Sequence, residues 1–412
     1  MSSTILALEH PTQVLSGTVT LPASKSESNR ALIIEALSGS GSVLNNLSEA
    51  NDTQVITRLL KQSAEDLNAE DAGTVMRFMT AYLAVTGQQK TITGTPRMLQ
   101  RPIGVLVDAL RQLGAQINYL GQEGYPPLAF RGIDRSQDYP ATIKVRGDIS
   151  SQYISALLMV APLFPKGLTL ELTGKIGSRP YIQMTLGLMQ HFGVEGIFEG
   201  NIIRVPAQSY KPAVYTIESD WSGASYWYSM VALAKEATIE LKGLRQESFQ
   251  GDSAIATIMQ NIGVQTTYNQ ESITLTKTNI CLPFSHDFSD CPDLAQTIAV
   301  VCAARGIPAE MSGLESLRIK ETDRIAALQT ELQKIGGDLE DAGAGVFRVK
   351  PIQPIRQTPV FHTYEDHRMA MAFAPLALLN KIAIEDPQVV RKSYPRFWQD
   401  LESMGFRLEN NK

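Results

Sequence analysis

Leu188-Met-Gln-His-Phe192-Gly193-Val194 carries the pattern on which the architecture of this chain depends, because versions of it recur along the sequence. Each version ends a helical pattern with an apolar residue and a glycine, just before a short run typical of a strand. Glycine adopts the left-handed conformation past a helix end without a steric penalty, which explains its fixed place. The glycine returns at intervals of roughly 70 residues, as expected of repeated structural units: Gly114, Gly193, Gly263, Gly336 and Gly405.

A second kind of segment precedes each of these helices and has a polar or acidic start followed by small and apolar residues. Because such a helix is apolar on nearly every face, we expect it to be buried. The helix that ends on glycine keeps a polar face, for example Gln329 and Glu331, and should lie outside. The six apolar segments are 24–37, 71–84, 148–160, 220–234, 293–302 and 366–373.

Strand patterns lie between the helical segments, which makes the chain an α/β protein of six similar units. A chain of 412 residues is too long for one core, so we expect two similar domains of three units each. The division falls near 217–220, and it follows from the repeat rather than from composition. The clearest strand patterns are 17–22, 141–146, 168–172, 237–241 and 272–276.

Composition and charge exclude several classes of protein. The formal net charge of −5 argues against a nucleic-acid partner, and the three cysteines and five histidines have no metal-ligand spacing. The apolar runs are too short to span a membrane, and the first residues do not resemble a signal peptide. We therefore expect a cytoplasmic protein with reduced thiols, no metal and no membrane partner.

The most charged stretch is Arg318-Ile-Lys320-Glu321-Thr322-Asp323-Arg324, which has five charges in seven residues and precedes a helical pattern. Thr322 or Ser316 could cap that helix. One interpretation is a solvated helix start laced by surface ion pairs. The other is an anion site with a proton-transfer group, because buried helices lying side by side would gather their positive ends on one face of each domain.

Other helix starts carry groups suited to anions and hydroxyls. Lys25, Ser26 and Arg30 open the first helix, where the glycines that a nucleotide-binding P-loop needs are missing. Arg77 lies in an apolar helix, so it requires an anionic partner. Further helix starts offer the backbone N–H groups at Gly73 and the side chains of Arg101, Ser150, Ser151, Gln152, Ser178 and Tyr181.

Together these motifs resemble the 5-enolpyruvylshikimate-3-phosphate synthase family over nearly the whole chain and in the same order. The resemblance implies two domains, each of three βαβαββ units with buried parallel helices, that close over the substrates. It places residues 1–22 with 219–412 in one domain and 23–218 in the other. The matching residues are Leu21 to Ser26 with Arg30, Ala72 to Thr74 with Met76 and Arg77, Pro96-Arg97 with Arg101 to Ile103, Ser150 to Gln152, Pro292-Asp293, Arg318 with Lys320 to Arg324, and Asp366 to Ala370.

The activity implied by the resemblance is transfer of the enolpyruvyl group of phosphoenolpyruvate to the 5-hydroxyl of shikimate 3-phosphate, on the route to chorismate and aromatic amino acids. No cofactor is implied, and we expect a monomer. Asp293 and Glu321 would be the acid/base pair, with Lys25 assisting. Residues that would bind shikimate 3-phosphate are Lys25, Ser26, Arg30, Ser150, Ser151, Gln152, Ser178, Tyr181, Asp293 and Lys320. Residues that would bind phosphoenolpyruvate are Lys25, Gly73, Arg101, Gln152, Arg324, Arg368 and Lys392.

Two alternatives remain at this point. One is the related transferase acting on UDP-N-acetylglucosamine, which relies on a loop cysteine that the region around 97–101 lacks. The other is a non-catalytic repeat protein that binds metabolites. The sequence also departs from the family pattern without losing a catalytic group, at Asp71, Phe78, Ser316 and Glu365.

Overall fold

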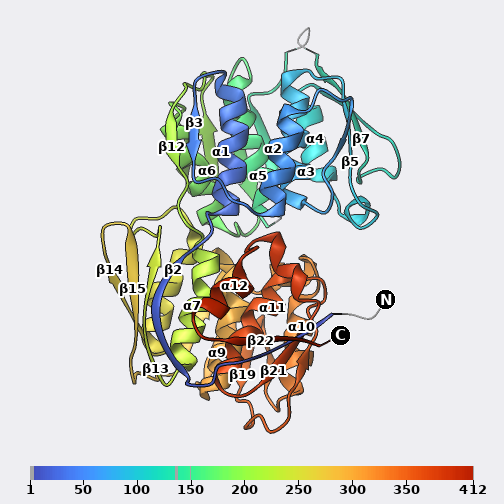
Figure 1. The fold of residues 1–412 in the computed structure, drawn as a ribbon. Helices are drawn as coiled ribbons and strands as arrows, with labels where there is room; N and C mark the ends of the chain where they lie inside the picture. Colours follow the sequence, from blue (N-terminus) through green and yellow to red (C-terminus); the bar gives the residue numbers. More distant parts are fainter. Residues whose placement is uncertain (1–3, 135–137, 149, 412) are drawn as a thin grey trace. The chain divides into compact units, whose positions relative to one another are not determined.

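A computed structural model describes residues 4–134, 138–148 and 150–411 (Figure 1). The chain divides into two compact units, and each is described by itself below. The N-terminal unit is Ser24–Ile217, and the C-terminal unit joins Met1–Ala23 to Glu218–Lys412.

The N-terminal unit contains two four-stranded sheets and one two-stranded sheet, with strand orders β4-β5-β7-β6, β10-β11-β9-β8 and β12-β3. Its elements in chain order are α1 (Lys25–Ser38), β3 (Val43–Asn45), α2 (Asn51–Lys61), β4 (Asp66–Asn68), α3 (Gly73–Thr86), β5 (Thr91–Thr93), α4 (Gly104–Gln112), β6 (Ala115–Tyr119), β7 (Leu128–Ile133), β8 (Thr142–Arg146), α5 (Ser151–Val160), β9 (Leu168–Thr173), α6 (Arg179–His191), β10 (Ile197–Glu199), β11 (Ile202–Val205) and β12 (Val214–Thr216).

The C-terminal unit contains three four-stranded sheets, with strand orders β20-β21-β1-β22, β14-β15-β13-β2 and β16-β17-β19-β18. Its elements are β1 (Ile5–Glu9), β2 (Val14–Thr20), α7 (Trp221–Leu233), β13 (Glu236–Lys242), η3 (Gly251–Ala254), α8 (Ile255–Asn261), β14 (Val264–Tyr268), β15 (Ser272–Lys277), β16 (Phe284–Asp287), η5 (Pro292–Leu294), α9 (Ala295–Arg305), β17 (Ala309–Ser312), η6 (Glu315–Ile319), α10 (Arg324–Gln333), β18 (Asp338–Gly343), β19 (Val346–Lys350), β20 (Val360–Phe361), α11 (His367–Phe373), β21 (Ile382–Glu385), η8 (Pro387–Lys392), α12 (Phe397–Ser403) and β22 (Arg407–Asn411).

One strand arrangement recurs in the four-stranded sheets: two parallel neighbouring strands on one side and two further strands, paired antiparallel, on the other. β16 and β17 form such a pair around α9, and α10 then leads to the β18–β19 hairpin. β8 and β9 do the same around α5. The α/β repeat predicted from the glycine period is confirmed, and Gly114, Gly193, Gly263, Gly336 and Gly405 all have φ between 77° and 96°.

The first helix of each repeat is buried, as its apolar composition predicts. α1, α3 and α5 pack against one another in the N-terminal unit (Figure 1), and α7, α9 and α11 do so in the C-terminal unit. Within α9 every residue from Ala295 to Ala303 is buried. The helix starts are thereby brought together, which positions the polar groups described below.

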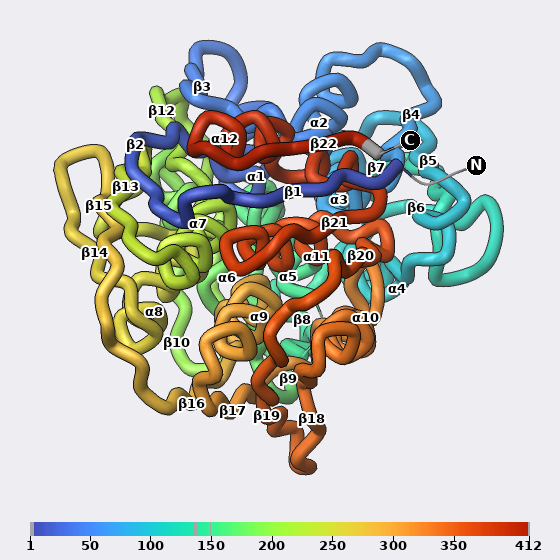
Figure 2. Tube along the Cα trace, turned by 60° about the horizontal axis from the view of Figure 1, so that its bottom comes forward, coloured from blue at the N-terminus to red at the C-terminus, as the bar shows by residue number. Residues whose placement is uncertain are grey.

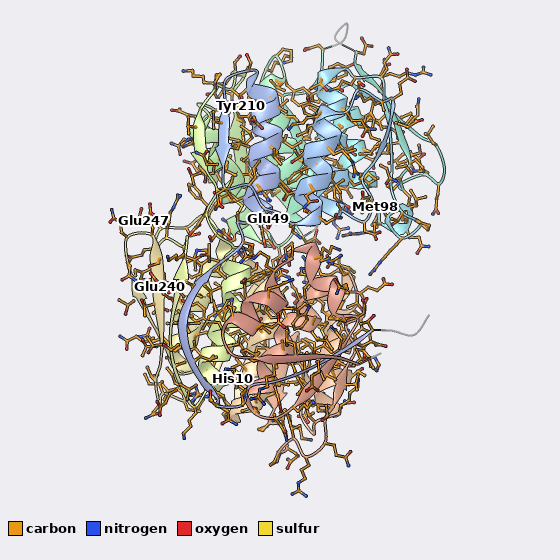
Figure 3. All side chains as sticks on the ribbon, in the orientation of Figure 1. His10, Glu49, Met98, Tyr210, Glu240 and Glu247 are labelled. Atoms are coloured by element: carbon orange, nitrogen blue, oxygen red, sulfur yellow. The ribbon has the colours of Figure 1, made fainter. Side chains whose placement is uncertain are left out.

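The N-terminal segment completes two sheets of the C-terminal unit. β1 lies between β21 and β22, and Figure 2 shows this strand running between its two neighbours. β2 pairs in parallel with β13. His10, in the turn between β1 and β2, is buried (labelled in Figure 3). Its Nε2 lies 3.1 Å from the carbonyl oxygen of Met404, a contact that connects this turn to the residue after α12.

Two details differ from the expectations. Glu331 does not lie on an outer polar face but is fully buried. Its carboxylate accepts hydrogen bonds from the Tyr364 hydroxyl at 2.7 Å and from the His362 N–H at 3.0 Å, which compensate for its burial. α10 is capped by neither Thr322 nor Ser316. It starts at Arg324, and the Asp323 carboxylate accepts hydrogen bonds from the N–H groups of Ile325 and Ala326, each at 3.1 Å.

Candidate active site

Arg324, the first residue of α10, is the centre of the polar cluster in the C-terminal unit. Its side chain is 1% exposed, although it is the last residue of the most charged stretch of the sequence. Nε donates to Asp366 Oδ2 at 2.7 Å, Nη1 to Asp293 Oδ1 at 3.0 Å, and Nη2 to Glu321 Oε2 at 3.0 Å. The planar guanidinium thus donates in fixed directions to three carboxylates at once, a rigid geometry that the rotating ammonium of a lysine does not impose.

Arg368, at the start of α11, is the second buried guanidinium. Its Nη2 lies 2.9 Å from Asp293 Oδ2, so Asp293 bridges the two arginines. Nη1 donates to the Tyr226 hydroxyl at 3.3 Å, and Nη2 donates to Ser222 Oγ at 3.4 Å. Starts of the helices α7, α9 and α11 therefore meet at this arginine.

Glu321 lies between two cations. Its Oε1 is 3.1 Å from Lys392 Nζ and its Oε2 is 3.0 Å from Arg324 Nη2, with 14% of the side chain exposed. Lys392 comes from η8, far along the chain, so only the fold brings this pair together. A partly exposed carboxylate held by two cations is suited to contact a substrate and exchange a proton with it.

The charges in this cluster shift the acidity of its members. Burial alone would raise the pKa of Asp293, but Arg368, Lys320 and Arg324 outweigh it and hold that pKa well below the usual range. Burial lowers the pKa of the half-buried Lys320, and Asp293 opposes the effect. Asp293 is therefore ionised at neutral pH, and the cluster has four cations against Asp293, Glu321 and Asp366.

Lys25 opens α1 in the N-terminal unit and points to an acidic residue that the sequence did not single out. Its Nζ lies 3.4 Å from Asp52 Oδ2, on the first turn of α2. The Lys25 side chain is 19% exposed and that of Asp52 is 6% exposed, so the ammonium keeps an open side. Ser26 beside it is half-buried.

Arg30, one turn further along α1, is 2% exposed and joins three elements. Nε donates to Thr185 Oγ1 at 2.8 Å, Nη2 to Ser155 Oγ at 3.0 Å, and Nη1 to the Ser26 carbonyl at 2.7 Å. These acceptors are neutral, and burial lowers the pKa of Arg30 to about 10. Arg30 therefore keeps its positive charge while all three of these acceptors are uncharged. A buried cation of this kind is suited to bind an anion.

Two rings lie against the Arg30 guanidinium. Its Cζ is 5.3 Å from the ring centroid of Phe78 and 5.5 Å from that of Tyr181. Phe78 was noted as a departure from the family pattern, and the structure gives it a defined role as a packing partner of this cation. Asp71, another departure, accepts a hydrogen bond from the Thr95 hydroxyl.

Gly73, the first residue of α3, lies against two guanidinium groups. A Cβ atom at this position would lie 2.7 Å from Nη1 of both Arg77 and Arg101. Arg77 is 5% exposed and donates to the carbonyls of Gly73 at 2.9 Å and Pro102 at 3.1 Å. The predicted anionic partner of Arg77 is thus replaced by main-chain oxygens, and two positive charges meet at one helix start.

The neutral groups predicted for hydroxyl recognition lie at the starts of α5 and α6. Gln152 Nε2 donates to Thr74 Oγ1 at 3.0 Å, which ties α5 to the start of α3. Ser150 caps α5 through the Gln152 N–H, and Ser151 is its first helical residue. Ser178 precedes α6 with φ of 54°, and Tyr181 lies in its first turn.

The predicted site residues are thus divided between the two units. Lys320, Glu321, Arg324, Asp293, Arg368 and Lys392 belong to the C-terminal unit, and the others belong to the N-terminal unit. Several polar residues that contact the predicted site residues or each other were not predicted from the sequence, because no motif around them in the sequence marks them. These residues are Asp52, Ser155, Thr185, Ser222 and Asp252. Asp52 could have been found as an acid in the first turn of a helix.

Comparison with known proteins agrees with these motifs. The family model described as EPSP synthase (3-phosphoshikimate 1-carboxyvinyltransferase) matches residues 10–64 and 57–401. A 3-phosphoshikimate 1-carboxyvinyltransferase of Bacteroides fragilis (strain YCH46) is 50% identical over 406 residues, 98% of each chain. The enzyme of the same name from Cellvibrio japonicus is 39% identical and covers 93% of this chain and 95% of its own length.

Solved structures show the same fold. EPSP synthase from Acinetobacter baumannii matches with a TM-score of 0.82 over 100% of both chains, at 19% identity. The enolpyruvyl transferase NikO from Streptomyces tendae matches with a TM-score of 0.74 over 100% of both chains, at 14% identity. The predicted fold class is confirmed. Because the family model and relatives of up to 50% identity match nearly the whole chain, the chain belongs to the EPSP synthase (3-phosphoshikimate 1-carboxyvinyltransferase) family.

Proposed function

We propose that this chain transfers the enolpyruvyl group of phosphoenolpyruvate to the 5-hydroxyl of shikimate 3-phosphate and releases phosphate. Family membership supports this reaction over transfer to UDP-N-acetylglucosamine and over a non-catalytic binding role. The observation that carries the assignment of residues is the buried Arg324, whose guanidinium holds Asp293 and Glu321 at 3.0 Å each.

The reaction has two steps, and each requires proton transfer. In the first, the 5-hydroxyl oxygen adds to C2 of phosphoenolpyruvate, losing its proton while the methylene carbon C3 gains one. In the second, C3 loses a proton, the C2–O bond to phosphate breaks, and the double bond forms again. The chain must therefore supply an acid/base group near C3 and another near the 5-hydroxyl. It must also supply cations for the phosphate that leaves, for the phosphate of the shikimate ligand and for the carboxylate of each substrate.

The residues of the C-terminal unit suit the proton transfers. Glu321 is partly exposed between Lys392 and Arg324, and we assign it the proton at C3. Asp293 is ionised by its cationic neighbours, so we assign it the 5-hydroxyl of the shikimate ligand. Arg324, Arg368 and Lys392 would hold phosphoenolpyruvate, and Lys320 the shikimate ligand.

The residues of the N-terminal unit suit substrate binding. Lys25, Gly73, Arg101 and Gln152 would complete the contacts to phosphoenolpyruvate, and Lys25 would assist the proton transfers. Residues assigned to shikimate 3-phosphate are Lys25, Ser26, Arg30, Ser150, Ser151, Gln152, Ser178 and Tyr181. Arg30 would act mainly through its charge, because three of its nitrogens donate within the protein.

Phosphate release with both substrates tests the reaction. The purified protein should release phosphate with shikimate 3-phosphate and phosphoenolpyruvate together, and not when UDP-N-acetylglucosamine replaces the shikimate ligand. No release with the first pair would reject the proposed function.

Glu321→Gln tests the catalytic assignment. The amide keeps the shape of the side chain but cannot take a proton, so we expect kcat to fall by about 10²–10⁴-fold. The KM for phosphoenolpyruvate should change by less than about threefold. Glu315→Gln is the matched control, since this glutamate lies exposed in η6 of the same segment. Turnover of Glu321→Gln equal to that of the control would remove Glu321 from the mechanism.

We further propose that the enzyme acts in the cytoplasm as a monomer. The three cysteines are all unpaired, which supports a reducing compartment. In the described parts of the chain, no helix has the length and apolar character needed to cross a membrane. Sedimentation of the purified protein over a range of concentrations tests the monomer.

A further inference from the structure

Asp252 is a buried acidic residue next to the proposed active site to which the mechanism assigns no role. It lies in η3 with 4% of its surface exposed. The hydroxyl of Ser222, in the first turn of α7, donates to its Oδ2. Its Oδ1 is buried and has no hydrogen-bond partner among the residues that the structure describes.

Ser222 links this carboxyl to the anion-binding cations. The same Oγ that donates to Asp252 accepts from Arg368 Nη2 at 3.4 Å. Arg368 Nη2 also lies 2.9 Å from Asp293 Oδ2. Asp252, Ser222, Arg368 and Asp293 therefore form a continuous chain of polar contacts, and Asp252 is its inner end.

The surroundings of Asp252 favour its protonated form. A buried carboxylate oxygen with no donor costs more free energy when it is charged than when it carries a proton. Burial and then Asp293 raise the pKa of Asp252 to about 7, while Arg368 and the Ser222 hydroxyl oppose the shift. The other ionisable groups facing it are Asp220, at the start of α7, and Cys291, just before η5.

We propose that Asp252 is a positioning residue for Arg368, which it holds through Ser222 while it carries a proton, so that it does not compete with phosphoenolpyruvate for the guanidinium charge. This inference rests on the proposed function. Asp293 contrasts with it, because that carboxylate is ionised and pairs directly with Arg368. The protonated Asp252 fixes the arginine without neutralising it.

The consequence is a pH dependence of substrate binding. Once Asp252 loses its proton, a second negative charge lies near Arg368 and opposes the binding of an anion. The KM for phosphoenolpyruvate should therefore rise above about pH 7 and level off once Asp252 is fully ionised. In Asp252→Asn, an amide of the same shape that cannot ionise, this rise should be absent.

The experiment measures kcat and the KM for phosphoenolpyruvate of the full chain and its variants from about pH 6.5 to 8.5. The substrate also titrates, so the informative quantity is the ratio of the KM of the unsubstituted enzyme to that of Asp252→Asn at each pH. We expect this ratio to lie near one at about pH 6.5 and to increase by about 3–10-fold at about pH 8.5. Glu402→Gln, which removes one exposed charge from α12 of the same unit, is the control. The ratio of the KM of the unsubstituted enzyme to that of Glu402→Gln should not change with pH.

A second pair of variants tests the link through the hydroxyl. Ser222→Ala removes the contact between Asp252 and Arg368, and should raise the KM for phosphoenolpyruvate by about tenfold with a smaller change in kcat. Ser222→Thr keeps the hydroxyl and should restore most of the affinity. This pair decides the question even if Asp252→Asn does not fold, which thermal melting would show.

Two results would overturn the role of Asp252. One is a KM ratio that does not change with pH, and the other is a folded Ser222→Ala enzyme whose KM equals that of Ser222→Thr. Either result with an active unsubstituted enzyme rejects only this inference. An unsubstituted enzyme that releases no phosphate rejects the proposed function instead.

Discussion

Replacing Arg324 with methionine should destabilise the C-terminal unit, and the structure allows the size of the effect to be worked out. Methionine fills similar space but cannot pair with the three carboxylates that contact the guanidinium. Asp293 would keep Arg368 at 2.9 Å, and Glu321 would keep Lys392 at 3.1 Å. Asp366 would lose the guanidinium that now lies 2.7 Å away.

The cost is therefore that of one buried carboxylate left without its cation. The Asp366 side chain is 0% exposed and would keep the N–H of Arg368 at 2.8 Å as a hydrogen-bond donor. Removing one partner of a buried ion pair costs about 3–5 kcal/mol. In a unit of about 200 residues this lowers the melting temperature by about 10 °C.

Thermal unfolding of the full chain, followed by circular dichroism near neutral pH, measures this shift. Arg318→Met is the matched control, since that side chain is 48% exposed and pairs with Asp323 at 3.3 Å on the surface. A surface pair contributes about 0–1 kcal/mol, so the control should melt within about 3 °C of the unsubstituted protein. If Arg324→Met melted as high as this control, the reasoning about the buried cluster would be refuted.

Three further predictions follow from the same contacts. Gly73→Ala would place a Cβ 2.7 Å from Nη1 of both Arg77 and Arg101, so the KM for phosphoenolpyruvate should rise by about tenfold; a KM equal to that of the unsubstituted enzyme would contradict the importance of this contact. The pKa of Asp252 in the folded protein is about 7, above its ordinary value, so the free energy of unfolding should fall as pH rises from about 4 to 7. Asp252→Asn should lack this part of the loss, about 3 kcal/mol in urea unfolding between about pH 4 and 7, and a difference between the two proteins that does not change with pH would contradict it. The segment 24–217 closes its own sheets and should melt cooperatively when expressed alone, whereas removal of residues 1–22 takes β1 from between β21 and β22 and should leave the C-terminal unit unable to fold.

The sequence by itself determined the repeat, because its signals are local. A glycine past a helix end, a small-residue apolar helix and a β-branched strand each reflect the conformational preference of a few neighbouring residues. Their recurrence predicted six α/β units, and the described residues form five sheets with the same strand arrangement and a sixth reduced to the pair β3 and β12. The charged residues at helix starts were also visible, since helix ends attract such groups for local reasons.

Only the tertiary structure decided which of these charges are buried and which partners they have. Arg318 and Arg324 are both arginines of one charged segment, yet the side chain of Arg318 is 48% exposed and that of Arg324 is 1% exposed. Asp366, which caps the buried α11, and Lys392, the last residue of η8, lie far from Arg324 along the chain, and only the fold brings them to this segment. The burial of a side chain and the identity of its partners depend on residues that are distant in the sequence, so no local pattern predicts them. For the same reason Asp252 could be found only from the contacts around Arg368.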